Sequence, residues 1–118
     1  MQDQRGQYKL LKVDNTDLDD LLCVVKKYPE QKFLINGMYP NEVKAFTDLD
    51  NVRIGTSAIE GCDIYRTLVE KYPSNRFVFS THTPLFVPEG NLFKIRCSSL
   101  SEQQRKWIGS ENIMQFLA

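Results

Sequence analysis

The chain lacks several features that point to common functional classes. Its 118 residues contain one histidine and three cysteines, with no Cys-x-x-Cys pair. Three widely spaced cysteines argue against a disulfide framework or a structural zinc site. A single histidine gives no Ser-His-Asp or Cys-His arrangement above chance. No Gly-x-Gly-x-x-Gly or Walker-type loop is present, so nucleotide binding has little support.

Charge and hydropathy argue against two further classes. Fifteen basic and fifteen acidic residues cancel, and neither end of the chain carries a block of one sign. Nucleic acids and membrane surfaces are therefore not expected as partners. No apolar run reaches the roughly 18–20 residues of a membrane-spanning helix. The first seven residues are polar, unlike a secretion signal. We expect a cytoplasmic protein in which residues 1–7 form a flexible N-terminal segment.

Short apolar runs alternate with helical patterns along the whole chain. Four of these runs read as strands, at residues 8–13, 32–36, 52–57 and 76–80. Apolar residues at helical spacing lie between them, and Pro29 and Pro73 end two of the helical segments. The alternation predicts a single α/β domain over residues 1–118. Its parallel sheet is expected to contain about four β/α units with right-handed crossovers.

The helical segments are expected to cover this sheet. The first begins at a cap in residues 14–16, and a short helix is expected over Pro40–Phe46. Ser101 and Gln104 match a capping box at the start of a later helix. Four large apolar residues are expected in the core because their helices must pack on the sheet. These are Phe93, Trp107, Phe116 and Leu117.

Polar residues follow three of the predicted strands. Because the carboxyl ends of parallel strands meet at one edge, where α/β proteins place their function, these residues form the candidate site. His82 is the candidate catalytic residue, and Asn36, Ser57, Thr81 and Glu60 are candidate ligand-binding residues. Structural roles stay open for each of them. The histidine can instead fix the turn before the following proline, a serine can cap a helix, and a glutamate can be solvated.

Four segments resemble the second half of an amidohydrolase-related (β/α)8 barrel. The most specific is Asp50-Asn51-Val52-Arg53-Ile54-Gly55-Thr56-Ser57, which is similar to the seventh-strand pattern of that family. The segment Arg76-Phe77-Val78-Phe79-Ser80-Thr81-His82-Thr83-Pro84 is similar to its eighth-strand pattern, usually Arg-x-Leu-Phe-Gly-Ser-Asp-x-Pro. The segment Tyr28-Pro29 with Phe33-Leu34-Ile35-Asn36 resembles the entry of the family's sixth strand. Residues 100–112 resemble the family's closing helices. The resemblance implies half of a TIM barrel and, in the complete protein, hydrolysis of a small molecule.

The resemblance also implies a metal centre that this chain does not reproduce. In such enzymes histidines and an aspartate hold a divalent metal such as zinc, and metal-bound water attacks the substrate. Asn36 stands at the sixth-strand histidine position, and His82 stands at the eighth-strand aspartate position. The first-strand His-x-His ligands belong to a half that this chain does not contain. We therefore expect no metal or other cofactor on the isolated chain, and no catalysis by the chain alone.

Three hypotheses remain for the whole molecule. The leading one is an amidohydrolase-like half-barrel that needs self-association or a missing N-terminal half, because strands cut from a barrel leave two unpaired edges. The alternative is a stand-alone α/β interaction or regulatory domain without catalysis. The third is a homodimer of half-barrels in which each chain completes the sheet of the other and the mouth binds a small molecule.

Overall fold

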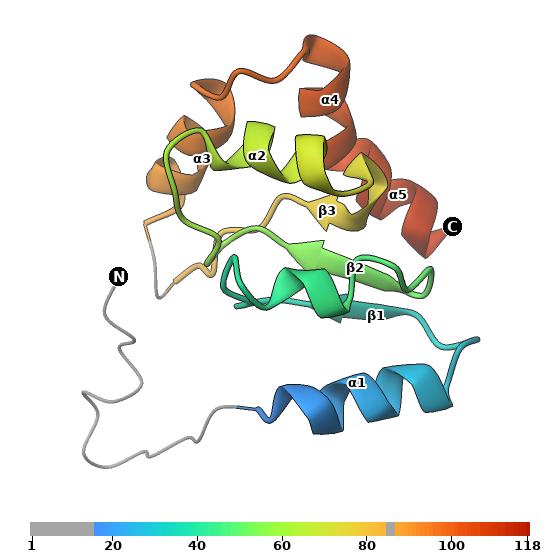
Figure 1. The fold of residues 1–118 in the computed structure, drawn as a ribbon. Coiled ribbons are helices and arrows are strands. Elements are labelled where there is room, and N and C mark those ends of the chain that lie inside the picture. The colour runs from blue at the N-terminus through green and yellow to red at the C-terminus, as the bar shows by residue number, and fades with distance from the viewer. Residues whose placement is uncertain (1–15, 85–86) are drawn as a thin grey trace, which may run out of the picture.

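The centre of the molecule is a three-stranded parallel sheet. The computed structural model describes residues 16–84 and 87–118. The strands are β1 (Phe33–Ile35), β2 (Val52–Gly55) and β3 (Phe77–Val78), in that order across the sheet (Figure 1). The prediction of an α/β fold with parallel neighbours is confirmed for these strands. The strand predicted at residues 8–13 and the segment 1–7 lie outside the described residues.

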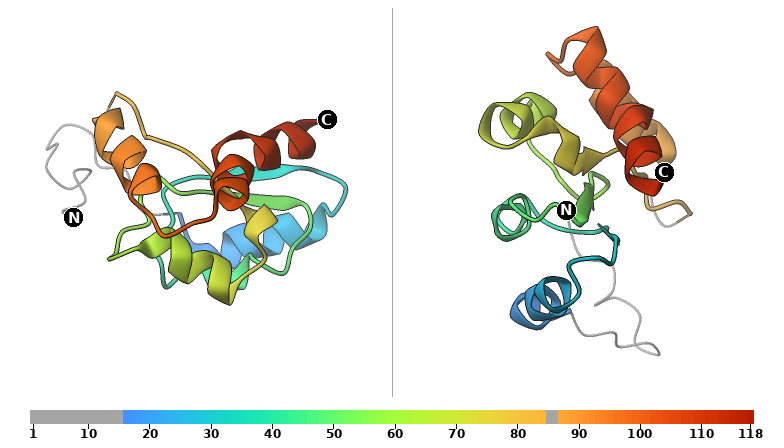
Figure 2. Two further views of the ribbon diagram at one scale, coloured as in Figure 1. Left: turned by 90° about the horizontal axis from the view of Figure 1, so that it is seen from above. Right: turned by 90° about the vertical axis from the view of Figure 1, so that its right-hand side faces the viewer.

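Helices lie on both faces of this sheet. On one face are α1 (Leu18–Lys27), the 3-10 turn η2 (Val43–Ala45) and α2 (Ile64–Lys71), and the short turn η3 (Ser74–Arg76) leads into β3 (Figure 2). After β3 come α3 (Pro88–Arg96), α4 (Glu102–Lys106), the π-turn η4 (Trp107–Glu111) and α5 (Asn112–Leu117). The last three form a continuous rod on the opposite face (Figure 2). In the described ranges, no helix combines the length and apolar character that crossing a bilayer requires.

The helix boundaries differ from the sequence prediction at two places. The cap of α1 is Asp17, one residue after the predicted 14–16, because its carboxylate accepts the N–H groups of Asp19 at 2.9 Å and Asp20 at 3.1 Å. A carboxylate suits this position because it also opposes the positive end of the helix dipole. The predicted helix over Pro40–Phe46 is only the three-residue turn η2. The capping box of Ser101 and Gln104 is confirmed.

The main core lies between the sheet and the face that carries α1 and α2. Val52, Ile54 and Phe77 point to that face and are fully buried, with Tyr65 and Leu68 of α2 packed against them. Burying such side chains stabilises a fold by about 1.5–3 kcal/mol each. Most of the hydrophobic stabilisation of the sheet therefore comes from side chains buried between it and helices α1 and α2.

The face of the sheet under the α4–α5 rod buries fewer side chains than the sequence predicts. Phe116 is buried there, and its ring lies 4.4 Å from the guanidinium carbon of Arg53. Phe93 and Leu117 are each 69% exposed and Trp107 is 37% exposed, so their prediction as core residues was wrong. A sheet of three short strands offers one rod little area, and Ile108 and Phe116 already fill it.

The outer edge of β3 is closed by the α4–α5 rod. The Phe79 N–H donates to the Ile108 carbonyl at 2.8 Å, and the Asn112 amide donates to the carbonyls of Phe77 and Ser74, both at 2.8 Å. The rod can offer these groups because it contains the π-turn, in which the Asn112 N–H bonds to the carbonyl of Trp107. Backbone and side-chain groups of a helix thus take the place of a neighbouring strand.

The edge of β1 is different. Among the described residues, β1 has a strand neighbour on one side only. The Phe33 N–H donates to the Asn51 carbonyl at 2.8 Å, so the N–H and C=O of the next residue, Leu34, point to the other side. The Leu34 side chain is 47% exposed. Of the two unpaired edges expected from a half-barrel, this is the one that the described part of the chain leaves open.

Replacing Asn112 tests the closure of the β3 edge. Asn112→Ala should lower the free energy of unfolding by about 1–3 kcal/mol, because the buried Phe77 carbonyl and the part-buried Ser74 carbonyl lose their donor. Urea denaturation followed by circular dichroism measures this. The control is Asn75→Ala, at an exposed position of η3, which should change stability by less than about 0.5 kcal/mol. Equal effects of the two substitutions would contradict a stabilising role for the closure.

Candidate functional site

Four polar side chains meet where the three strands end. Asn36 follows β1, Ser57 follows β2, and Ser80 and His82 follow β3. We call these four residues the edge site. Parallel pairing explains the meeting, because it brings the carboxyl ends of all three strands to the same side of the sheet (Figure 1).

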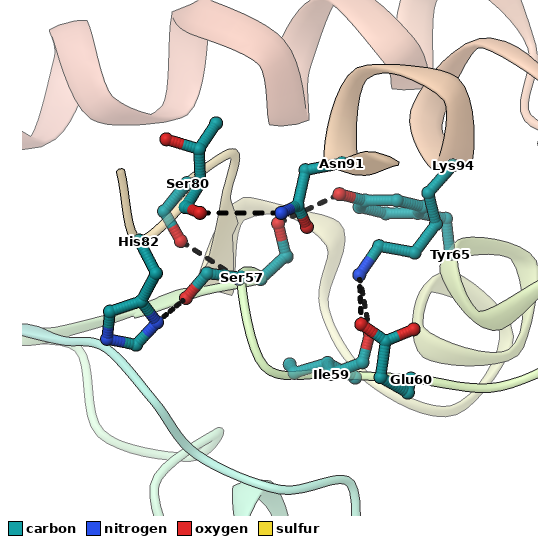
Figure 3. Close-up of polar contacts among 10 residues, drawn as sticks. Ser57, Ile59, Glu60, Tyr65, Ser80, His82, Asn91 and Lys94 are labelled. Carbon is teal, nitrogen blue, oxygen red and sulfur yellow. Dashed lines mark hydrogen bonds and ion pairs between the residues drawn. The ribbon is translucent and has the colours of Figure 1, made fainter. Parts of the chain in front are cut away.

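Hydrogen bonds join the chain after β2 to the chain after β3. The Ser57 hydroxyl lies 2.8 Å from Nδ1 of His82, and the Ser57 N–H donates to the Ser80 hydroxyl at 3.0 Å (Figure 3). Ser57 is 1% exposed, whereas His82 is half-buried. The serine is therefore a buried support, and the imidazole is the more accessible member of the pair.

Two glycines allow side chains to approach the backbone in the edge site. A Cβ atom at Gly55 would overlap Oδ1 of Asn36 and lie 2.7 Å from the Ser80 hydroxyl oxygen. A Cβ atom at Gly37 would lie 3.3 Å from Cε1 of His82, and Gly37 has a φ of 84°. The Asn36 amide therefore lies over β2, and the imidazole packs against the exit of β1.

His82 has an unusual backbone conformation. Its φ is 57°, in the left-handed region, and the Thr83–Pro84 peptide bond that follows is cis. A left-handed conformation at a residue with a side chain costs on the order of 1–3 kcal/mol and often marks a functional site. The bond between Ser57 and His82 is one contact that holds the imidazole in this position.

Helix α3 supports the two loops that carry the edge site. The Asn91 amide reaches the Thr81 carbonyl at 3.5 Å. Lys94 donates to the Ile59 carbonyl at 3.0 Å and pairs with the Glu60 carboxylate at 3.2 Å (Figure 3). Asn91 is 6% exposed, and its Oδ1 has no hydrogen-bond partner among the described residues. The helix thus contacts the β2 loop and the β3 loop at once.

A buried hydroxyl pair lies beneath this region. Tyr65 of α2 is fully buried, and its phenol lies 2.9 Å from the Thr56 hydroxyl (Figure 3). Burial raises the pKa of the Tyr65 phenol above its usual value. The phenol therefore stays protonated at neutral pH and can donate a hydrogen bond. This pair links α2 to the end of β2 directly beside Ser57.

The structure brings three of the five predicted site residues together and separates two. Asn36, Ser57 and His82 belong to the edge site. The Thr81 hydroxyl bonds to the hydroxyl of Thr83 at 2.8 Å, within its own loop. Glu60 is exposed and pairs with Lys94, on the other side of Ser57 from His82 (Figure 3). Glu60 lies three residues after Ser57, where the loop has already left the edge site, so its carboxylate does not reach His82.

Ser80 and the two glycines were missed by sequence reasoning. A signal for Gly55 existed, because an isolated glycine in a strand indicates close approach of another group. Ser80 lies two residues before His82, and in an extended segment such residues face the same side. No sequence signal indicated that Asn91 contacts the loop after β3, because this contact depends on how α3 packs against the rest of the fold.

The edge site carries little charge and few metal ligands. His82 is its only titratable residue, beside one amide and two hydroxyls. In residues 16–84 and 87–118, no three His, Cys, Asp or Glu side chains gather so that they could hold a metal ion. One His82 nitrogen already contacts Ser57. These residues do not fit the zinc site that the family resemblance implies, because such a site needs at least three N, O or S ligands.

Comparison with known proteins does not add a family. No protein-family model matches the chain, and neither a curated protein nor a solved structure matches it. The strand order and the chemistry of the edge site therefore carry the functional proposal.

Replacing Gly55 tests the close approach over β2. Gly55→Ala should lower the free energy of unfolding by about 1–3 kcal/mol and move the Asn36 amide, because the added methyl overlaps Oδ1. Urea denaturation and the NMR signal of the Asn36 side-chain amide report the two effects. Gly90→Ala is the control, since nothing lies within 4 Å of a Cβ there. It should raise stability by about 0.5–1 kcal/mol, because glycine is unfavourable in a helix. An unchanged Asn36 signal in Gly55→Ala would contradict the described packing.

Proposed function

We propose that the edge site binds a small polar molecule and that the chain is the site-bearing half of an amidohydrolase-like β/α protein. The observation that carries this proposal is the 2.8 Å contact between Ser57 and His82, which joins the ends of β2 and β3 beside Asn36 from β1. Function at the carboxyl edge of a parallel sheet is the rule in α/β proteins. Hydrolysis of a small molecule is the activity proposed for the complete protein.

The proposed ligand is an uncharged molecule that carries amide or hydroxyl groups. Asn36 offers both a donor and an acceptor, and the Ser80 hydroxyl can do the same. The edge site holds no lysine or arginine for a phosphate or carboxylate, and the nearby Lys94 is already paired with Glu60. An anionic ligand would therefore lose hydration without gaining a counter-charge.

The proposed role of His82 is proton transfer. When the Ser57 hydroxyl donates to Nδ1, the proton of the neutral ring is on Nε2. When Nδ1 carries the proton and donates to Ser57, Nε2 is a base. The direction of this hydrogen bond therefore follows the tautomer of the ring, and Nε2 is a hydrogen-bond donor in one tautomer and a base in the other. Ser57 itself is proposed as a positioning residue, because a hydroxyl that is 1% exposed does not meet a substrate. We derive no step through a metal, since the edge site does not fit one.

The proposal includes a fourth strand at the open edge of β1, formed by residues 8–13. Helix α1 begins at the end of the sheet where the strands end, and it lies on the same face as α2 (Figures 1 and 2). Four residues separate position 13 from α1. A strand there would run parallel to β1 with a right-handed crossover through α1, as β2 connects to β3 through α2. A strand from a second copy is the rival occupant of the same edge.

Ligand binding can be tested by NMR with a library of small amides and polyols. Compounds that bind should shift the backbone signals of Gly37 and Gly55 and the His82 ring signals. Ser57→Ala and His82→Ala should each weaken binding about tenfold, equal to about 1.4 kcal/mol.

The matched control is Glu60→Gln, which should leave the affinity unchanged because this side chain faces away from His82. Binding that survives both the Ser57 and the His82 substitutions, or that shifts signals elsewhere, would overturn the proposed site.

Hydrogen exchange tests the fourth strand. The Leu34 N–H points to the open edge, while the amides of Phe33 and Ile35 face β2, so the neighbours serve as internal controls. We expect slow exchange at Leu34 in the intact chain, and fast exchange there alone in Leu11→Pro, because proline disrupts a strand. Fast exchange at Leu34 in the unaltered chain would refute the fourth strand. Protection that rises with protein concentration would assign the edge to a second copy.

A further inference from the structure

The loop after β2 runs beside α3 and the turn that follows it. Near the start of this contact, Lys94 of α3 meets Ile59 and Glu60 of the loop, at 3.0 and 3.2 Å. Further along both segments, the Ser99 N–H donates to the Asp63 carboxylate at 3.0 Å. The two segments therefore advance side by side in the same direction, from residue 59 to 63 on one and from 94 to 99 on the other.

Each segment carries a cysteine between these two contacts. Cys62 directly precedes Asp63, and Cys97 lies three residues after Lys94 and two before Ser99. Cys97 is the residue that closes α3, and Cys62 precedes the first turn of α2. Both thiols are exposed, so an oxidant in solution can reach them. The contacts on either side thus place two accessible thiols on neighbouring stretches of backbone.

We propose that Cys62 and Cys97 are a redox-sensitive pair that joins in a disulfide under mild oxidation. A disulfide requires Cα atoms about 4.4–6.8 Å apart. The Asp63–Ser99 bond holds the backbones next to each other, and Gly61, with a φ of 156°, gives the loop a residue that adjusts readily. Cys23 lies on α1, which is at the far end of the molecule from α3 in Figure 1, and it serves as the matched control.

The chemistry is exchange with a small disulfide such as oxidised glutathione. One cysteine thiolate attacks the glutathione disulfide, forms a mixed disulfide and releases one glutathione thiolate. The second cysteine thiolate then attacks the protein sulfur of that mixed disulfide and releases the second glutathione. The two protein thiols are oxidised to one disulfide, two protons pass from them to the released glutathione thiolates, and the glutathione disulfide is thereby reduced to two thiols.

A disulfide between Cys62 and Cys97 would join two segments that position the edge site, the loop after β2 and helix α3. The loop from Ser57 to Asp63 would be tied covalently to α3, whose Asn91 contacts the Thr81 carbonyl. Oxidation is expected to slow the opening of this loop and to raise the midpoint of thermal unfolding. The inference does not depend on the nature of any ligand, so it stands or falls separately from the proposed function.

The test is oxidation of the native full chain with oxidised glutathione, followed by alkylation, trypsin digestion and mass spectrometry. The expected major product is about 2 Da lighter than the reduced chain, and its peptide 54–66 is linked to peptide 97–105. Cys23→Ser should keep this product, whereas Cys62→Ser and Cys97→Ser should each abolish it. The same oxidation in urea should yield a mixture that includes Cys23 linkages, because the fold no longer selects the pair.

Two results would overturn the proposal. One is stable glutathione adducts on both Cys62 and Cys97 without the linked peptides. The other is a native product in which Cys23 is the main partner. Circular dichroism of each serine variant shows that it is folded, and exposed cysteines are sites where serine is well tolerated.

Discussion

The bonds between the α4–α5 rod and the outer edge of β3 determine much of this structure. β3 has two residues, so its ladder with β2 alone fixes it weakly. The Ile108 carbonyl and the Asn112 amide add partners on the outer edge of β3 and hold the rod on the face of the sheet opposite α1 and α2. They also set the direction in which the chain leaves β3 toward Ser80 and His82. The geometry of the edge site therefore depends on a helix that contributes no side chain to it.

The same contact limits how a barrel-like assembly can form. In a closed barrel the outer edge of β3 would pair with another strand, but here the rod occupies it. Only β1 has an open edge among the described residues. Two copies joined through β1 about a twofold axis would pair antiparallel, because the axis reverses the strand direction. A homodimer that closes one parallel barrel would have to displace the rod.

Local patterns predicted β1, β2, β3 and the capping box at Ser101, because each depends on residues close in sequence. The crossover rule predicted the parallel pairing of these three strands. The meeting of Asn36, Ser57 and His82 followed from one topological rule about strand ends. The features that could not be predicted from the sequence are contacts between residues far apart in the chain. The side-chain amides of Asn112 and Asn51 both donate to carbonyls 20 or more residues away, and nothing in their sequence surroundings distinguishes them from surface asparagines. The exposure of Trp107 likewise follows from the width of the sheet.

The chemistry of the edge site defines what a partner half would have to supply. His82 can take or give a proton, but hydrolysis also needs donors placed where negative charge develops in the transition state. The Asn36 amide and the Ser80 hydroxyl both approach β2 where a Cβ of Gly55 would lie, and each group also carries an N–H or O–H donor. Neither carboxylate of the loop after β2 turns toward them, since Glu60 pairs with Lys94 and Asp63 accepts from the Ser99 N–H. A complete hydrolytic site would therefore need its acidic or metal-binding groups from residues other than these, and the open edge of β1, next to Asn36, is where they would arrive.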